Sequence, residues 1–393
     1  MSGRVIVVGS VNIDLVARVP ALPHPGETVT GGSYERHHGG KGGNQAVAAA
    51  RLRRPTLFIG ALGDDSFEGE ARRALASERV DVSMVASLPA QPTGMALILV
   101  DAAGENEIAV VPGANGAIEE GYARDCLGRL GRLTGDVVLV CNEVPLHVVR
   151  EALVCAHAAG ATTILNPAPA TGIDRAMLSL ADIITPNRNE LATLLATQGH
   201  RSGSRTDDAQ EVAERARPLI EDGAGGPGVR KAVIVTLGAS GVVVLEREGS
   251  GLGGTAAAAA SGGTEAGECA EGQGVGEAEA AAGAAQTPAA AEPPAGPAPA
   301  PTPASPAPAP STPAGPVAIR VWEAPAEKVA TIDSTGAGDA FNGALAAAIA
   351  EGRSLAEAVD RALVAGALAT TRAGAREGMA TAQELEEHLA SRR

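Results

Sequence analysis

The sequence repeats one local pattern over most of its length: a short run rich in β-branched residues, followed by an amphipathic helical stretch. Because a strand, a crossover helix and the next strand form a parallel unit, this repetition predicts a mostly parallel sheet with helices on both faces, which is an α/β fold. The predicted strands are residues 5–9, 56–61, 136–141, 162–165, 182–185 and 232–237, and the predicted helices include residues 43–52, 67–77, 146–158, 188–196 and 208–220.

Two regions interrupt this rhythm. Residues 15–36 are rich in Pro, Gly and Thr, and residues 94–111 are typical of a hairpin, with strands at 95–100 and 106–111 around a turn. Neither region suits a layer of a doubly wound sheet. Together they predict a small β-structure that projects from the main domain as a lid.

Residues 249–318 consist almost entirely of Ala, Gly, Pro, Glu, Ser and Thr. Such a segment buries too little apolar surface to offset the entropy of ordering it, so we expect a disordered insertion. The competing interpretation is a linker between two domains, but the residues after it are too few and too helical to form a second domain. The rest of the chain, residues 1–248 and 319–393, is therefore predicted to be one domain, with a hairpin of 242–246 and 319–323 around the insertion.

Composition limits the partners of the chain. Of the 393 residues, 45% are hydrophobic and 2% aromatic, so the core must be built from Ala, Val, Leu and Ile. The formal charge of −15 argues against a nucleic-acid partner, because a basic surplus is needed to neutralise phosphates. No apolar run approaches the roughly 20 residues of a membrane helix, so no membrane partner is expected.

The cysteines and the first strand suggest the compartment. Residues 4–9 are too short and too β-branched for a signal peptide. Cys126, Cys141, Cys155 and Cys269 show no CxxC pair and no neighbouring His pattern for zinc. They are interpreted as thiols in a reducing compartment, and a cytoplasmic location is expected.

The most specific motif is the run of residues 333–343, DSTGAGDAFNG, which follows a strand-like run at 328–332 and opens an Ala-rich helix. Glycines before a helix let backbone amides turn towards a ligand, and the helix dipole favours an anion there. Asp339, in the first turn, is placed to accept the proton of a hydroxyl that attacks a phosphoryl group. The simpler interpretation is a capping Asp in a tight turn. No Gly-Lys-Ser/Thr follows, so this is not a Walker A loop.

A second glycine cluster, residues 39–45 (GGKGGNQ), also lies directly before a predicted helix. Its bare backbone allows a small polyhydroxy ligand to approach closely, with Lys41 and Asn44 as donors. A flexible turn without a ligand is the alternative.

These two clusters, together with residues 9–14 (GSVNID) and 187–190 (NRNE), resemble the ribokinase-like family of sugar kinases, also described as phosphofructokinase-B type carbohydrate kinases. The resemblance extends from about Val5 to Ala390 and leaves only residues 249–318 unmatched. Further matching stretches, in family order, are residues 25–29, 63–65, 113–115, 166–170 and 236–238.

The resemblance implies a three-layer α/β/α fold with a mostly parallel central sheet and a small β-lid. It implies ATP-dependent phosphorylation of D-ribose on its 5-hydroxyl, with Mg²⁺ as cofactor, K⁺ as a monovalent activator, and a homodimer formed through the lid. Asp339 is then the general base, and the amides of Gly336, Ala337 and Gly338 form the anion hole. Asn12 and Asp14, at the end of the first strand, are implied to bind the sugar. The other residues implied to do so are Gly40, Lys41, Asn44 and Glu143.

The same resemblance assigns the nucleotide and metal positions. The nucleotide residues are Asn187, Thr236, Gly238, Ser240, Gly241 and again Gly338. Glu190 is implied to organise Mg²⁺ through water, although a carboxylate in a first helical turn is also favoured by the dipole alone. The monovalent-cation positions are Asp333, Thr335, Ala369, Arg372, Gly374 and Gly378, the last of which stands where the family often has a serine.

Several other functions remain open at this point. Nucleoside kinases stack a base on aromatic residues, and the predicted lid offers only Tyr34. Kinases of phosphorylated sugars need a cationic pocket, for which Arg18, Arg36, His37 and His38 are candidates, although a solvated rim is the simpler interpretation. Kinases of fructose or deoxyribose differ by single hydroxyl contacts that the sequence does not display. A catalytically silent sugar sensor on the same fold is a further alternative; a dinucleotide oxidoreductase is disfavoured because no GxGxxG follows the first strand.

Overall fold

The computed structural model describes residues 3–200, 208–223, 226–251 and 318–392, and its central element there is a sheet of nine strands in the order β13-β12-β11-β10-β9-β8-β1-β4-β5. Within this sheet, the seven neighbouring strands β11, β10, β9, β8, β1, β4 and β5 run parallel. Strands β12 and β13 add an antiparallel edge. Their bounds are β1 Val5–Val8, β4 Thr56–Gly63, β5 Val80–Leu88, β8 Val137–Cys141, β9 Thr162–Asn166, β10 Ile183–Ile184, β11 Ala232–Thr236, β12 Val242–Arg247 and β13 Ile319–Ala324. The predicted mostly parallel sheet is confirmed.

The sheet is buried on both faces, which explains why its strands are continuous apolar runs rather than alternating ones. In β1, Val5 and Val7 belong to one hydrophobic core, and Ile6 and Val8 belong to the other. Successive strand residues point to opposite faces, so one four-residue strand contributes to both cores.

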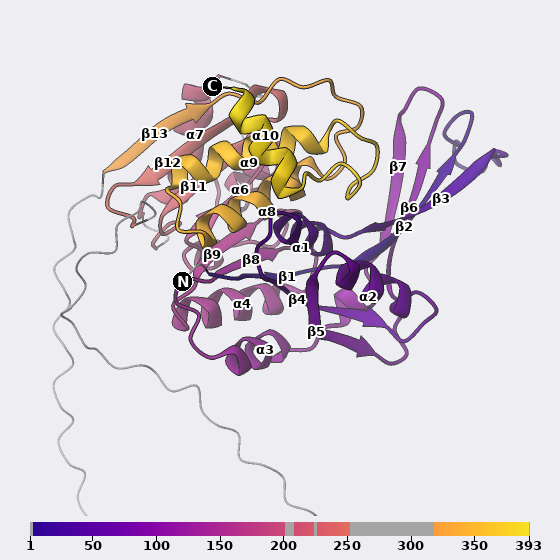
Figure 1. Ribbon diagram of the computed structural model, residues 1–393, viewed down its shortest axis with the longest axis horizontal. Helices are drawn as coiled ribbons and strands as arrows, with labels where there is room; N and C mark the ends of the chain where they lie inside the picture. Colours follow the sequence, from indigo (N-terminus) through magenta and orange to yellow (C-terminus); the bar gives the residue numbers. More distant parts are fainter. Residues whose placement is uncertain (1–2, 201–207, 224–225, 252–317, 393) are drawn as a thin grey trace, which may run out of the picture. The chain divides into compact units, whose positions relative to one another are not determined.

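Helices cover each face of the sheet (Figure 1). On one face lie α1 Lys41–Arg51, α2 Glu68–Ser77, α8 Ala337–Ala350, α9 Leu355–Ala369 and α10 Ala382–Ser391. On the other lie α3 Tyr122–Leu130, α4 Leu146–Ala158, α5 Arg175–Leu178, α6 Arg188–Thr197 and α7 Ala209–Ile220. The three-layer α/β/α arrangement is therefore confirmed. Small side chains bring α1 and α8 close together, since a Cβ at Gly343 would lie 2.6 Å from the Cβ of Ala48.

A second sheet of four strands, in the order β3-β2-β6-β7, projects from this body (Figure 1). It contains β2 Asn12–Arg18, β3 Ser33–Gly39, β6 Gly94–Val100 and β7 Asn106–Val111. Both regions predicted to form the lid contribute to it. Several of its large apolar side chains are exposed, namely Tyr34, Leu97, Ile108, Val110 and Val111.

The structure corrects two details of the sequence prediction. Residues 328–332 are not a strand, because β13 already occupies the sheet edge. Ile332 is 70% exposed and donates its N–H to the Thr370 carbonyl at 2.7 Å. Asn12 and Asp14 do not end the first strand either. They lie in β2, which belongs to the lid sheet, so the chain crosses from one sheet to the other between Val8 and Asn12.

The hairpin predicted around the insertion is confirmed: β12 and β13 pair antiparallel, and the Glu248 N–H donates to the Ala318 carbonyl at 2.9 Å. The predicted disordered insertion itself, residues 249–318, falls outside the described residues except for 249–251 and 318, as does Cys269. Among the helices described here, none has the length and apolar character needed to cross a membrane.

Candidate active site

The motif of residues 333–343 starts helix α8 through a left-handed glycine. Gly336 has φ of 75°, and a Cβ there would lie 2.6 Å from the carbonyl oxygen of Ala375. Only glycine suits both conditions. The turn places Asp339 in the first turn of α8, where it is 8% exposed. The amides of this first turn have no acceptor within the helix, although the Ala337 N–H donates to the Ser334 carbonyl at 3.3 Å.

Helix α1 holds the Asp339 carboxylate from the opposite side. Asn44 Nδ2 donates to Asp339 Oδ2 at 3.0 Å, and Gln45 Nε2 donates to Asp339 Oδ1 at 3.1 Å. Burial raises the pKa of Asp339, against the opposing effects of the Lys41 charge and of the Asn44 hydrogen bond. Its carboxylate is thus oriented by two neutral amides and can serve as a proton acceptor.

Gln45 extends this network and was not predicted from the sequence. Its Nε2 also donates to Asn166 Oδ1 at 3.0 Å, at the end of β9. Its Oε1 is buried and has no hydrogen-bond partner within the described part of the chain. A buried acceptor without a donor is unusual in a closed core and fits a site that receives a hydroxyl group.

The N-terminus of α1 is built around Glu143, which follows β8. The Glu143 Oε2 accepts from the Lys41 N–H at 3.0 Å and from Ser10 Oγ at 2.6 Å, and the Lys41 Nζ lies 3.8 Å from Glu143 Oε1. Gly40 precedes the helix with φ of 82°, and a Cβ there would lie 2.6 Å from the Cα of Val11. The bare backbone is therefore needed to seat the 39–45 cluster against the segment that leads into β2.

Lys41 is the cation of this site. Burial lowers the pKa of Lys41, but the negative charges of Asp339 and Glu143 outweigh it, so the pKa ends above its ordinary value. The ammonium group therefore remains charged, 3.8 Å from Glu143 Oε1 and under the influence of the Asp339 charge. It can neutralise negative charge that develops near them.

Asn12 and Asp14 reach the same region from β2. Asn12 Oδ1 accepts from Asn115 Nδ2 at 2.8 Å, and Asn115 Oδ1 accepts from the Val11 N–H at 3.0 Å. Asp14 lies against Gly39, because a Cβ at Gly39 would lie 2.0 Å from Asp14 Oδ2. Burial raises the pKa of Asp14 to about 6, although the charge of Arg376 opposes the shift.

Arg376 is a second residue that sequence reasoning missed. It is 6% exposed, its Nε donates to Asn44 Oδ1 at 2.9 Å, and its Nη2 donates to the Gly39 carbonyl at 3.0 Å. The only available signal was its position in a Gly-Ala-Arg-Glu-Gly loop. Its partners are about 330 residues away in the sequence, so no local pattern could pair them.

Apart from Gly338, which lies in the first turn of α8, the predicted nucleotide residues gather at the ends of β10 and β11. Asn187 pairs with Thr236 in a parallel bridge, and the Thr236 N–H donates to the Pro186 carbonyl at 2.9 Å. Gly238 and Ser240 form a 3₁₀ turn, closed where the Leu237 N–H donates to the Gly241 carbonyl at 2.8 Å. These residues therefore form one loop cluster at the carboxyl edge of the sheet, where open α/β sheets bind ligands.

Asn187 and Glu190 form a capping box on α6. Asn187 Oδ1 accepts from the Glu190 N–H at 2.9 Å, and Glu190 Oε2 accepts from the Asn187 N–H at 2.8 Å. Burial raises the pKa of Glu190, against the Asn187 hydrogen bond and the Lys41 charge. No group of three or more His, Cys, Asp or Glu side chains suited to a metal occurs in the described residues, so a Mg²⁺ ion here would need water and phosphate oxygens beside Glu190.

The predicted monovalent-cation positions lie on the loop before α8, at the end of α9 (Ala369) and on the loop after it, and Asp333 joins the two loops. Its Oδ1 accepts from the Thr335 N–H at 2.9 Å, and its Oδ2 accepts from the Gly374 N–H at 2.9 Å. Gly378 has no room for the serine side chain often found in the family, because a Cβ there would lie 2.0 Å from the carbonyl oxygen of Ala369. The two segments thus meet through the Asp333 carboxylate.

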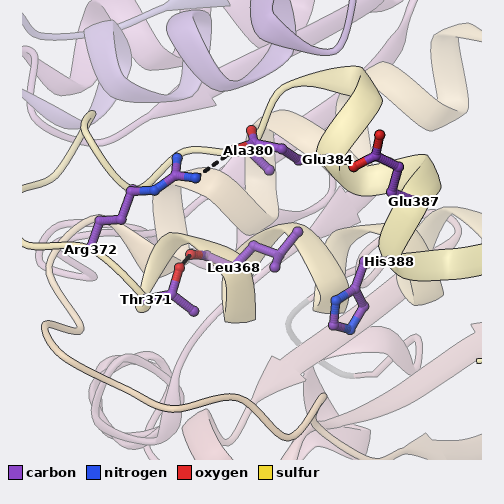
Figure 2. Close-up of a pocket in the computed structure, with 8 residues that line it drawn as sticks. Leu368, Thr371, Arg372, Ala380, Glu384, Glu387 and His388 are labelled. Carbon is purple, nitrogen blue, oxygen red and sulfur yellow. Dashed lines mark hydrogen bonds and ion pairs between the residues drawn. The ribbon is translucent and has the colours of Figure 1, made fainter. Parts of the chain in front are cut away.

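Arg372, predicted in the same set, directs its side chain elsewhere. Figure 2 shows it reaching Glu384 of α10, to which Arg372 Nη2 donates at 2.5 Å. The cavity in that view has a volume of about 250 Å³ and is lined by Leu368, Thr371, Arg372, Gly378, Ala380, Glu384, Glu387 and His388. None of the residues predicted to bind sugar or to transfer the phosphoryl group lines it.

Known proteins are similar to this chain in sequence and in fold. A ribokinase of Haemophilus influenzae is 37% identical over 244 residues, covering 62% of this chain and 75% of that protein. A deoxyribokinase of Salmonella typhi is 30% identical over 245 residues, covering 62% and 75%. The solved structure of an Arabidopsis thaliana ribokinase complexed with ribose and ATP matches with a TM-score of 0.70 and 25% identity, covering 99% of each chain.

A family model also matches most of the chain. The profile of the pfkB family carbohydrate kinases matches residues 2–259 and 320–382. The match includes both glycine clusters, the NxxE motif and Asp339, which are the residues that the fold gathers. The chain therefore belongs to the pfkB family of carbohydrate kinases.

Proposed function

We propose that the chain phosphorylates D-ribose on its 5-hydroxyl with ATP as the phosphate donor. The observation that carries this proposal is the buried carboxylate of Asp339, held by Asn44 and Gln45 beside the glycine turn that starts α8. A base at a helix N-terminus lies next to the place where that helix attracts an anion, so proton acceptor and phosphoryl group are brought together.

In the proposed reaction, Asp339 accepts the proton of the sugar hydroxyl as its oxygen bonds to the γ-phosphorus of ATP. The bond from that phosphorus to the β-phosphate oxygen breaks, and ADP leaves. The amides of Gly336, Ala337 and Gly338 face the negative charge of the transferred group, and Lys41 supplies a positive charge that interacts with Asp339 and Glu143. Because Ala337 already shares its N–H with Ser334 at 3.3 Å, Gly336 and Gly338 are the freer donors of the three. Fixed donors of this kind reduce the reorganisation needed in the transition state.

The nucleotide would lie along the loop cluster of Asn187, Thr236, Gly238, Ser240 and Gly241. When bound with ATP, Mg²⁺ would neutralise charge on the β- and γ-phosphates. Glu190 is the carboxylate proposed to hold the water molecules around this ion. The sugar would lie among Asn12, Asp14, Gly40, Lys41, Asn44 and Glu143. A carboxylate can accept from two adjacent hydroxyls, which makes Asp14 the anchor for the ring diol.

The choice of ribose as the substrate rests on the similar proteins and on the ion pairs of the lid. Ribokinases are among the most similar relatives, but so is a deoxyribokinase, and one hydroxyl separates their substrates. The lid cations that a phosphorylated sugar would need are engaged with carboxylates instead: Arg18 and His37 with Glu35, Arg36 and His38 with Glu70, and His37 also with Glu377. This pairing disfavours a phosphorylated substrate.

The test is an ADP-release assay with ATP and Mg²⁺ over ribose, 2-deoxyribose, fructose, adenosine and fructose 6-phosphate, with and without K⁺, alongside Asp339→Asn. Turnover on ribose that is lost in the variant supports the assignment. Turnover on deoxyribose or fructose in place of ribose would overturn the substrate and retain the mechanism. Ribose binding without turnover on any sugar would identify a silent sensor.

Two further features belong to this proposal. The exposed apolar side chains of the lid (Tyr34, Leu97, Ile108, Val110 and Val111) are suited to burial against a second copy, so we propose a homodimer through the lid. Light scattering of the wild type and of a Leu97→Lys, Ile108→Lys variant tests this, with a monomeric variant expected. K⁺ at the two Asp333-linked loops and a cytoplasmic location, where ATP is supplied, complete the proposal.

A further inference from the structure

Arg376 is a buried cation that the proposed reaction has not used. It lies in the loop after α9, its guanidinium is almost wholly enclosed, and both of its hydrogen bonds end on neutral oxygens, Asn44 Oδ1 at 2.9 Å and the Gly39 carbonyl at 3.0 Å. Removing a cation from water is costly unless its surroundings compensate for it. The negative groups that act on it are Asp14, Glu78, Glu377 and Asp339. Two of these four belong to the candidate active site.

The contact with Asn44 determines which way its amide faces. Asn44 accepts from Arg376 through Oδ1 and donates to Asp339 through Nδ2 at 3.0 Å. If the amide were reversed, its NH₂ group would face a guanidinium and its oxygen would face a carboxylate, and both hydrogen bonds would be lost. Arg376 therefore makes Asn44 a donor to the proposed base.

The second contact connects Arg376 with the sugar carboxylate. Its Nη2 holds the carbonyl of Gly39, and the same glycine is packed against Asp14, where an added Cβ would lie 2.0 Å from Oδ2. Space around the guanidinium is tight, because a Cβ at Gly43 would lie 2.6 Å from Nη2. The cation is thus placed between the residue that anchors the sugar and the residue that holds the base.

We propose that Arg376 is a positioning residue for phosphoryl transfer, which fixes the Asn44 amide towards Asp339 and keeps Asp14 available as an acceptor for the sugar diol. The proposal rests on the proposed function. It makes two separable claims, one on the rate of transfer and one on sugar affinity.

Arg51, the last residue of α1, contacts the same loop and offers a matched control. Arg51 Nη1 donates to the Arg376 carbonyl at 2.5 Å and to the Met379 carbonyl at 2.9 Å, and its other nitrogens pair with Glu78. Arg51 therefore holds the backbone of the loop without contacting Asn44 or Asp339. If Arg376 only braced the loop, loss of Arg51 would have similar kinetic consequences.

The experiment compares Arg376→Met, Arg376→Gln and Arg376→Lys with Arg51→Met, using kcat, KM for each substrate, calorimetric ribose binding without ATP, and thermal unfolding. For Arg376→Met we expect kcat to fall about a hundredfold, ribose affinity to fall about tenfold, and KM for ATP to stay within about twofold. Arg376→Lys should recover part of the affinity, since it keeps the charge. Arg51→Met should lower the unfolding temperature and leave kcat within about twofold. Arg376→Gln retains polar groups and serves if the Met variant does not fold.

A double-mutant cycle with Asn44→Ala isolates the route to Asp339. If Arg376 acts on the rate through Asn44, Arg376→Gln should lower kcat by no more than about twofold in the Asn44→Ala background. An equal loss in both backgrounds, or an Arg51→Met variant with the same kinetic loss, would overturn the proposal.

The outcomes also separate this proposal from the proposed function. A wild type that prefers another sugar corrects the substrate, and the same series is then read on that sugar. A wild type that binds ribose without turnover refutes the proposed function. Calorimetric ribose binding then tests the role of Arg376, and an unchanged ribose affinity in Arg376→Gln would refute it.

Discussion

Replacing Asp14 by Asn is expected to stabilise the protein while it impairs sugar binding. Burial raises the pKa of Asp14 from 3.8 to about 6, even with Arg376 nearby, so the folded protein holds the ionised carboxylate at a cost. A group whose pKa is raised on folding binds more protons when folded, so stability falls as pH rises from about 4 to about 6 and is then level. The full cost above pH 6 is about 3 kcal/mol, from about two pKa units at roughly 1.4 kcal/mol each.

The assay is denaturant unfolding of the wild type and of Asp14→Asn, without sugar, at pH 7.5 and at pH 4.5. The neutral amide avoids the cost, so the variant should be more stable by up to about 3 kcal/mol at pH 7.5 and by only about 1 kcal/mol at pH 4.5. Calorimetry at pH 7.5 should show ribose binding weakened about a hundredfold, as expected when charged hydrogen bonds to two hydroxyls are lost. A variant that is no more stable than the wild type at pH 7.5, or a gain that does not depend on pH, would refute this reasoning.

Four further predictions follow from the site. Asp339→Asn should lower kcat by about 10²- to 10⁴-fold while ribose affinity changes only a few-fold, measured by ADP release and calorimetry, because the amide cannot accept the proton. Gly336→Ala should lower the free energy of unfolding by about 1–3 kcal/mol in denaturant, since alanine is strained at positive φ and meets the Ala375 carbonyl. Glu190→Gln should raise the Mg²⁺ concentration for half-maximal activity about tenfold, with ribose KM unchanged, because the amide attracts the cation less than a carboxylate does; an unchanged Mg²⁺ titration would exclude this role. Ribose KM of the wild type should rise below about pH 6, where Asp14 becomes protonated, and a flat KM between pH 5 and 8 would contradict its role as acceptor.

The layers of this fold follow from local patterns, and so they were predictable. Each strand of the parallel sheet is a short apolar run, and each amphipathic helix has one apolar face, so α4 was predicted at its observed bounds, Leu146–Ala158. The prediction of a strand at residues 328–332 was wrong, because a run rich in β-branched residues is equally compatible with an extended segment outside a sheet. Whether such a segment joins a sheet depends on a free edge, and β13 had taken that edge.

Only the site residues that belong to local sequence motifs were predicted. Asp339, Lys41 and Asn44 stand in glycine-rich runs with clear local character. Gln45 is the last residue of the 39–45 run and has no local signal that separates it from other helical residues. Arg376 lies in an irregular loop. Their importance comes from contacts with Asp339 and Asn44 across about 300 residues, and such contacts exist only after folding.

The hydrogen bond between the Glu248 N–H and the Ala318 carbonyl, at 2.9 Å, closes the β12–β13 hairpin where the chain leaves and rejoins the sheet. The residues of the proposed active site fall on both sides of this point in the sequence. Asn44, Gln45 and Glu143 come before the hairpin, and Asp339 and Arg376 come after it. A gene cut between the codons for residues 251 and 318 would thus yield two fragments, each lacking half of the site. Kinase activity would then report their reassembly, which makes this hairpin a natural place to build a split enzyme.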